Sequence, residues 1–165
     1  MRLRRLAVAL VLPLAFTACL EGTDYSTNVT PEIPIEQTTF ASTLNVSLPA
    51  STKTASGLYI RDLTVGTGDV ATGTSTVSVY YAGYLANGQL FDSRSSPSAP
   101  FPVQLGVNAV IKGWEEGLIG MKVGGKRQLI IPPSLAYGPN GYGSIPSNAV
   151  LVFTVELVAV QKPAQ

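Results

Sequence analysis

The sequence predicts an α+β domain in which a curved antiparallel β-sheet wraps around one short α-helix. Three observations predict this class. Glycine (16 residues) and proline (12 residues) are frequent in the 165-residue chain, which is typical of many turns. From residue 57 onward, several segments alternate apolar and polar residues with the period of a half-buried strand. Only segment 110–121 has a helical apolar period, so one helix is available to cover the sheet.

The expected strands follow one another with turn residues between them. They are segments 58–65, 76–85, 91–93, 101–105, 126–132 and 150–160. In segment 76–85 Val77, Val79 and Tyr81 share one face, and Asn87-Gly88 behind it is a strong hairpin signal. Segment 150–160 is the longest and places its apolar residues on one face in the same way. Each strand therefore has one face to bury.

The expected helix contains the only tryptophan of the chain. Its apolar stripe has the spacing i, i+4, i+8 and i+11 and consists of Val110, Trp114, Leu118 and Met121. Asn108 is the expected N-cap residue. Gly113 and Gly117 each cost about 1 kcal/mol relative to alanine in a helix. We expect them to let the helix backbone approach the sheet closely, so that Trp114 lies against it.

The N-terminal residues have the pattern of an export signal. Arg2, Arg4 and Arg5 precede the apolar segment 6–16, which is too short to span a bilayer. Residues 16–19, Phe-Thr-Ala-Cys, resemble the bacterial lipobox, with Phe16 in place of the usual leucine. The resemblance implies a signal peptide over residues 1–18, a membrane anchor of acyl chains on Cys19, and, because Leu20 follows, outer-membrane sorting in a Gram-negative cell. The alternative is an ordinary secretory signal with an incidental cysteine.

Residues 19–55 are expected to form a flexible tether between the lipidated cysteine and a folded domain at 56–162. They are rich in threonine, serine and proline and show no sustained helical or strand period. A short apolar alternation at 40–48 is a candidate for one additional strand.

Composition and motifs exclude several classes of function. Without the three arginines of the signal, eight basic and ten acidic side chains remain, so charge gives no case for nucleic-acid binding. The chain has no histidine, which removes the usual general base and most transition-metal sites, and we expect neither a metal nor a cofactor. The glycine-rich segment 66–73 is not followed by a helix, unlike a dinucleotide-binding loop.

The remaining charged clusters are expected to be structural. Glu115 and Glu116 are adjacent on the expected helix and point in different directions, so we expect both to be solvated. Lys122, Lys126 and Arg127 are expected to be exposed charges at a strand end rather than a phosphate site.

An aromatic and apolar set with one acid is left as the candidate site. It consists of Tyr81, Phe91, Asp92, Phe101, Val110, Ile111, Trp114, Tyr137 and Phe153. These residues could simply form the core that a domain of this size needs. Many of them, however, lie beside loops rich in glycine, proline and serine, as Tyr137 does in AYGPNGYGSIP.

Several motifs, in order and spacing, resemble the FKBP-type peptidyl-prolyl cis–trans isomerases. They are VYYAGYLANGQLFDSR, PFPVQLG, VIKGWEEGLIGMKVGGKRQLIIPPSLAYG and IPSNAVLVFTVELV. The resemblance covers residues 56–161. It implies the FKBP fold and a cofactor-free enzyme that acts on X–Pro bonds of proteins that fold in the bacterial envelope, at an outer membrane on its periplasmic side. It also implies that macrolide inhibitors are possible ligands.

The resemblance also implies which residues form the site. Residues in catalytic positions are Tyr81, Phe91, Asp92, Ile111, Trp114, Tyr137 and Phe153, and those in substrate-binding positions are Phe101, Val110 and Ile145. Trp114 would be the floor beneath the substrate proline, and the N–H of Ile111 would donate to a substrate carbonyl. Ile145 would form an apolar lip of the pocket.

The chain departs from the family pattern at some positions. Pro97 occupies the place of an arginine that pairs with the acid at Asp92, and Arg94 is a candidate substitute. Tyr80 and Tyr142 replace two family histidines, Ala109 replaces an acid, and the 138–146 loop is one residue short. Two other functions stay open: a membrane-tethered peptide-binding or chaperone module with little isomerase activity, and a tether that holds partner proteins in the envelope.

Overall fold

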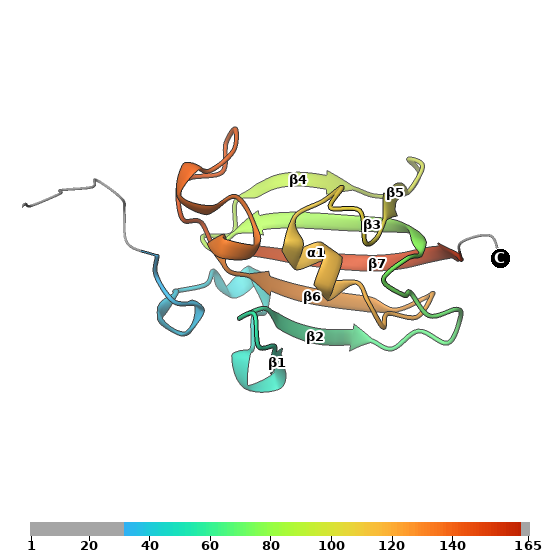
Figure 1. Ribbon diagram of the computed structural model, residues 1–165. Helices are drawn as coiled ribbons and strands as arrows, with labels where there is room; N and C mark the ends of the chain where they lie inside the picture. The colour runs from blue at the N-terminus through green and yellow to red at the C-terminus, as the bar shows by residue number, and fades with distance from the viewer. Residues whose placement is uncertain (1–31, 163–165) are drawn as a thin grey trace, which may run out of the picture.

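The computed structural model describes residues 32–162, which fold as a strongly bent antiparallel sheet over one helix (Figure 1). The strands are β1 (Thr52–Lys53), β2 (Tyr59–Thr64), β3 (Thr76–Leu85), β4 (Leu90–Arg94), β5 (Phe101–Gln104), β6 (Lys126–Ile131) and β7 (Leu151–Gln161). Their order is β1-β2-β6-β7-β3-β4, and β5 pairs with β3. The predicted α+β class, with a curved sheet around a short helix, is confirmed.

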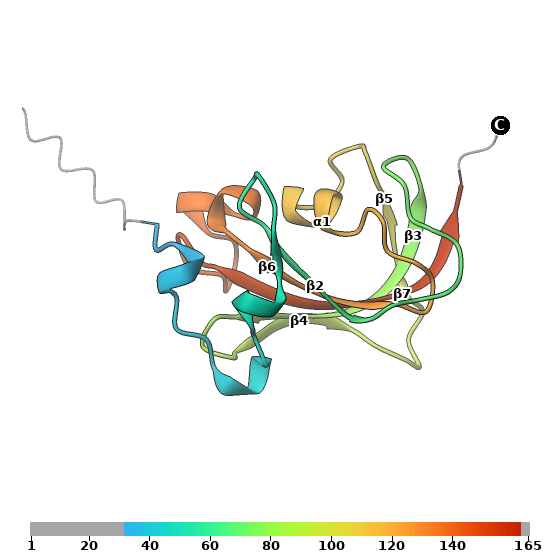
Figure 2. The ribbon, with the colours of Figure 1, turned by 90° about the horizontal axis from the view of Figure 1, so that it is seen from below.

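The helix α1 (Lys112–Gly117) lies on the concave face of the sheet (Figure 2). Trp114, Leu118 and Met121 are buried there in the main core. A Cβ atom on Gly113 would lie 2.5 Å from Cγ2 of Ile131, and one on Gly117 would lie 2.7 Å from a methyl carbon of Leu129. The two glycines therefore permit the close approach that the sequence analysis predicted.

The start of the helix differs from the prediction. Asn108 is not the N-cap: α1 begins four residues later, after Ile111, and no side chain caps it. Asn108 instead has a positive φ of 56° in the preceding loop. Oε2 of Glu115 accepts the backbone N–H of Gly106 (2.6 Å), so this carboxylate fixes the loop and is not simply solvated. With only six residues in the helix, Val110 and Met121 lie outside it and Leu118 is its C-cap, so only Trp114 of the predicted stripe is within the helix.

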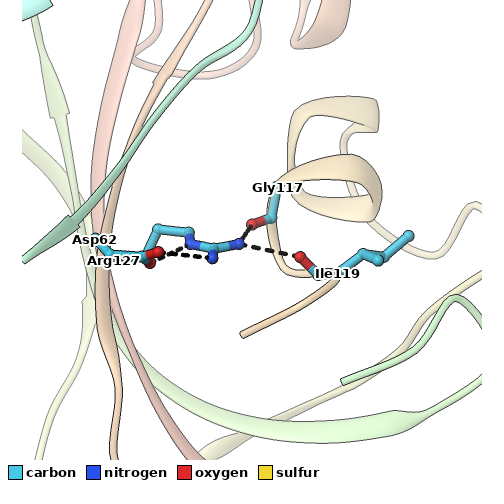
Figure 3. A network of polar contacts seen from close by, with 4 residues as sticks. All are labelled: Asp62, Gly117, Ile119 and Arg127. Atoms are coloured by element: carbon cyan, nitrogen blue, oxygen red, sulfur yellow. Dashed lines mark hydrogen bonds and ion pairs between the residues drawn. The ribbon is translucent and has the colours of Figure 1, made fainter. Parts of the chain in front are cut away.

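Arg127 closes the other end of the helix (Figure 3). Its Nη1 donates to the carbonyls of Gly117 (2.8 Å) and Ile119 (3.0 Å), while Nε and Nη2 donate to the carboxylate of Asp62 (2.7 and 3.2 Å). The prediction of an exposed charge was wrong for Arg127, which is only 8% exposed. The terminal carbonyls of a helix lack intrahelical partners and favour a cation, which explains why the side chain turns inward.

Residues 32–53, which we call the strap, are folded against the outer face of the sheet (Figure 2). The strap contains the 3₁₀ turns η1 (Ile35–Gln37), η2 (Ser42–Leu44) and η3 (Leu48–Ala50) and the strand β1. The expectation of a flexible tether is therefore wrong for this segment, and the candidate strand at 40–48 is not formed. Two further 3₁₀ turns, η4 (Pro133–Leu135) and η5 (Gly138–Asn140), lie before β7.

Apolar burial explains why the strap is ordered. Its buried residues Ile35 and Leu44 belong to a second core on the outer face, together with Tyr59, Ile130, Val150 and Val152. Strands β2, β6 and β7 therefore bury apolar residues on the outer face of the sheet as well as on the face that covers the helix. The period alone indicated one buried face, and so it did not reveal this second core.

Polar contacts join the two ends of the strap to each other and to strand β2. Glu36 accepts hydrogen bonds from Lys53 and from the hydroxyl of Tyr59, and these bonds lower the pKa of Glu36 to about 2. Near the middle, the N–H of Ala41 donates to the carbonyl of Ala86 (2.8 Å).

The expected signal peptide and Cys19 lie outside the described residues. Within residues 32–162 no helix is long and apolar enough to cross a membrane.

Candidate active site

A pocket of about 200 Å³ opens beside the helix on the concave side of the sheet. Strands β3, β4, β5 and β7, the helix and two loops each contribute to its wall. The lining residues are Tyr81, Phe91, Asp92, Phe101, Ala109, Val110, Ile111, Trp114, Tyr137 and Phe153. The structure therefore brings together nine residues of the candidate set, which come from positions up to 72 residues apart in the chain.

Trp114 lies at the centre of this pocket and is held by edge-to-face contacts. Its ring centroid is 5.0 Å from that of Tyr81, 5.2 Å from Phe153 and 6.5 Å from Phe101, with interplanar angles of 83°, 81° and 74°. Phe91 in turn meets Phe153 at 5.5 Å and 88°. Such T-shaped pairs are a favoured aromatic geometry and hold the rings in defined orientations. The result is a rigid aromatic enclosure around one tryptophan.

One polar pair lies in the wall of the pocket. The hydroxyl of Tyr81 donates to Oδ2 of Asp92 (2.7 Å), across the antiparallel pair of β3 and β4. Burial, followed by this hydrogen bond, raises the pKa of Tyr81 to about 12. Tyr81 therefore keeps its proton, and keeps donating to Asp92, throughout the neutral pH range.

Arg94 does not take the place of the missing arginine. It lies on β4 and lines a separate hollow together with Tyr80 and Glu156. Among the ion pairs of residues 32–162, none involves Arg94 or Asp92. The partner of the Asp92 carboxylate is a neutral phenol instead.

The loop after β6 forms the outer rim. Tyr137 lines the pocket and stacks on Tyr142, with centroids 5.2 Å apart and an interplanar angle of 14°. Burial, followed by the nearby Tyr142 and Asp92, raises the pKa of Tyr137. Tyr142 is 70% exposed, so the stack extends an aromatic surface from the pocket into solvent.

Two assignments from the sequence differ from this geometry. Ile145, expected as an apolar lip, is only 7% exposed and belongs to the main core rather than to the pocket lining. A backbone bridge to Tyr142 holds it there, so it supports the rim from inside. Ala109 also lines the pocket, although the sequence analysis named it only as a departure from the family pattern, because a small apolar residue in a loop gives no signal of a binding role.

The chemistry that this arrangement offers is binding rather than proton transfer. The wall presents aromatic faces, two aliphatic residues before the helix, and a carboxylate that already accepts a hydrogen bond. Within residues 32–162, no three side chains of the metal-binding types lie close enough together to hold an ion. A compact apolar ring, flanked by amide groups, is the kind of ligand that fits such a wall.

Comparison with known proteins agrees with the fold and the pocket. Residues 67–158 match the model of the family described as FKBP-type peptidyl-prolyl cis-trans isomerase. The chain therefore belongs to this family, and its domain is an FKBP-type peptidyl-prolyl cis–trans isomerase.

Relatives of known sequence and structure support this assignment. An FK506-binding protein of Neisseria meningitidis serogroup B is 49% identical over 105 residues, which are 63% of this chain and 96% of the relative. FK506-binding protein 4 of Chaetomium thermophilum is 47% identical over 109 residues. These residues are 66% of this chain but only 22% of that longer protein. The crystal structure of FkpA from Escherichia coli matches with a TM-score of 0.64 at 39% sequence identity. The match covers 70% of this chain and 53% of the FkpA chain.

Proposed function

We propose that this protein catalyses the cis–trans isomerisation of X–Pro bonds in polypeptides that fold in the bacterial cell envelope. The observation that carries the proposal is the aromatic pocket around Trp114, whose apolar rings form a surface suited to an apolar proline ring. The family of the chain supports the reaction. The pattern of the N-terminal residues supports the location.

The reaction needs no nucleophile and no proton transfer. Rotation about the X–Pro bond faces a barrier of about 18–20 kcal/mol, set by amide resonance. Without a catalyst, isomerisation takes tens to hundreds of seconds. A twisted amide has lost its resonance and much of its charge separation, so an apolar enclosure opposes it less than water does. An enzyme that binds the twisted amide better than the planar one lowers the barrier.

We assign roles to the pocket residues on this basis. Phe91, Trp114 and Phe153 enclose the proline ring, with Trp114 as the floor. The N–H of Ile111 and the hydroxyl of Tyr137 hold substrate carbonyls on either side of the rotating bond. The remaining lining residues have supporting roles: Tyr81 orients Asp92 beside the twisted carbonyl, and Phe101 and Val110 contact the residues that flank proline.

The location is proposed from the first 19 residues. We propose that residues 1–18 are a signal peptide and that Cys19 carries acyl chains that anchor the protein at the periplasmic side of an outer membrane. More than one chain is required, because a single acyl chain binds a membrane only marginally. Replacement of Cys19 by serine should release the protein from the membrane fraction and abolish incorporation of labelled fatty acid. A variant that stays lipidated, or a wild-type protein without lipid, would contradict the anchor.

A protease-coupled assay with a proline tetrapeptide tests the activity. We expect the full chain to accelerate isomerisation, and a pocket-filling macrolide to block it. The Trp114→Leu variant should lose most of this turnover while its circular dichroism stays close to that of the wild type. Unchanged turnover in this variant would refute Trp114 as the floor. Chaperone activity without acceleration would show a peptide-binding module in place of an enzyme.

A further inference from the structure

The loop that joins β5 to α1 forms one side of the aromatic pocket (Figure 1). It spans residues 105–111, and we call it the rim loop. Its last three residues, Ala109, Val110 and Ile111, line the pocket. Most of the aromatic side chains of the pocket stand on strands or on the helix, whereas these three residues depend on a loop for their position. The geometry of this side of the pocket is therefore only as well defined as the rim loop.

The backbone of the rim loop is bent at two positions with positive φ. Gly106 has a φ of 84°, and Asn108 has a φ of 56°. A positive φ costs free energy in a residue that has a Cβ atom, and it persists where surrounding contacts hold the backbone in place. The conformation at Asn108 therefore requires contacts that hold the loop.

Glu115 on α1 makes hydrogen bonds at both ends of the rim loop. At the start of the loop, its Oε2 accepts the backbone N–H of Gly106 (2.6 Å). At the end of the loop, its own backbone N–H donates to the carbonyl of Ile111 (3.2 Å), which also accepts the N–H of Trp114 (2.9 Å). One helical residue thus closes the loop into a ring, and residues 107–110 lie within that ring.

The second oxygen of this carboxylate shows that the arrangement has a cost. Oε1 of Glu115 is buried and has no hydrogen-bond partner among residues 32–162. A buried polar atom without a partner destabilises the fold, and the penalty is larger for a charged group than for a neutral one. Local features that lower stability are typical of sites where function requires a particular geometry. Holding the rim loop is such a requirement.

We propose that Glu115 is a positioning residue of the isomerase, which holds the rim loop so that the N–H of Ile111 points to the substrate carbonyl. Glu115 does not line the pocket and acts through its bond to Gly106. A misplacement of about 1 Å in a positioning group can lower a rate by roughly 100-fold. This inference rests on the proposed function, because it uses the role assigned there to Ile111.

Substitutions at Glu115 test the proposal in the tetrapeptide assay with the full chain. Glu115→Leu removes the acceptor of the Gly106 N–H, and we expect kcat to fall about tenfold with little change in KM, because the bond from Ile111 counts mainly in the twisted state. Glu115→Gln retains an acceptor oxygen and should restore most of the turnover. Unchanged turnover in Glu115→Leu, or an equal loss in Glu115→Gln, would overturn the proposal.

The adjacent glutamate provides the matched control. Glu116 also lies on α1, but its carboxylate accepts the hydroxyl of Ser56 (2.7 Å) and makes no bond to the rim loop. Glu116→Leu therefore makes the same chemical change one residue away and should leave kcat and KM as in the wild type. A tenfold loss in this variant as well would overturn the proposal, because it would show a general effect of charge removal on α1.

Backbone ¹⁵N relaxation of the full chain measures the position of the loop without reference to activity. In Glu115→Leu, the order parameters of residues 107–111 should fall from about 0.85 toward about 0.6, and they should stay high in Glu115→Gln and Glu116→Leu. A lower unfolding temperature with unchanged order parameters would overturn the proposal, since Glu115 would then serve stability alone. A wild type inactive on the tetrapeptide would refute the proposed function, whereas the order parameters would still decide whether Glu115 holds the loop.

Discussion

Replacement of Gly113 by alanine tests whether close contact between helix and sheet sets the position of the pocket floor. In an ordinary helix this change is favourable by about 1 kcal/mol, because alanine has the higher helix propensity. Here the added Cβ would lie 2.5, 2.8 and 3.0 Å from three side-chain carbons of Ile131, which is fully buried on β6. Distances this short require either the helix or Ile131 to move.

The cost of this overlap exceeds the gain in propensity. Overpacking of a core costs about 1–3 kcal/mol, and we take the upper end because Ile131 is fully buried and three of its carbons lie within 3.0 Å of the added Cβ. After the helix gain of about 1 kcal/mol is subtracted, we expect a net loss of about 2 kcal/mol. For a domain of this size, such a loss lowers Tm by roughly 4–8 °C. Because Trp114 follows directly in the helix, tetrapeptide turnover should fall as well.

Thermal unfolding followed by circular dichroism, together with the tetrapeptide assay, measures both effects. Gly73→Ala is the matched control, because a Cβ there would lie an ordinary 3.6 Å from Cδ1 of Ile119. The control should unfold close to the wild-type temperature and keep its turnover. A Gly113→Ala variant that is more stable than the wild type, with full turnover, would refute the close-contact argument.

Three further outcomes follow from the structure. Arg127→Met should lower the free energy of unfolding by roughly 1.5–3 kcal/mol, since the charge-assisted hydrogen bonds to the carbonyls of Gly117 and Ile119 and the ion pair with Asp62 are lost. Lys126→Met, which removes an exposed ion pair, should change little in the same denaturant titration. Deletion of the strap should lower the unfolding midpoint by several degrees and increase binding of an apolar dye, because it uncovers the second core. The raised pKa of Tyr81, about 12, means that the stabilisation from its hydrogen bond to Asp92 is complete below pH 10 and lost as pH rises through 12. Absorbance of tyrosinate should therefore show one late-titrating group fewer in Tyr81→Phe than in the wild type, in which Tyr59 and Tyr137 also have raised pKa values.

The sheet and most of the pocket could be predicted from the sequence because their signals are local. Segment 76–85 alternates with period two and coincides with β3. The motifs around Trp114 and Tyr137 keep the family spacing, and the structure brings these residues into one pocket. Tyr142, named only as a departure from the family pattern, stacks on Tyr137 and so enlarges the rim.

The missed features depend on contacts between distant residues. Arg127 appeared to be one of three basic residues at a strand end, and nothing local shows that it points toward the carbonyl ends of α1. The composition of the strap is typical of a loop. Its order comes from two apolar residues that pack on strands far along the chain, and composition does not reveal such contacts. Ile145 matched a rim position, but the 138–146 loop is one residue shorter than the family pattern, and the structure places this side chain in the main core.

The second core also determines when the domain can be completed during synthesis. Ile35 and Leu44 are made early, yet they pack against Val150 and Val152 of the last strand. β7 is in addition the strand between β3 and β6, so neither half of the sheet is closed without it. Contacts with such long sequence separations form late in folding and are slow to close. In a chain that emerges N-terminus first, the sheet and the second core therefore stay incomplete until β7 has appeared, and their apolar faces favour aggregation over that interval.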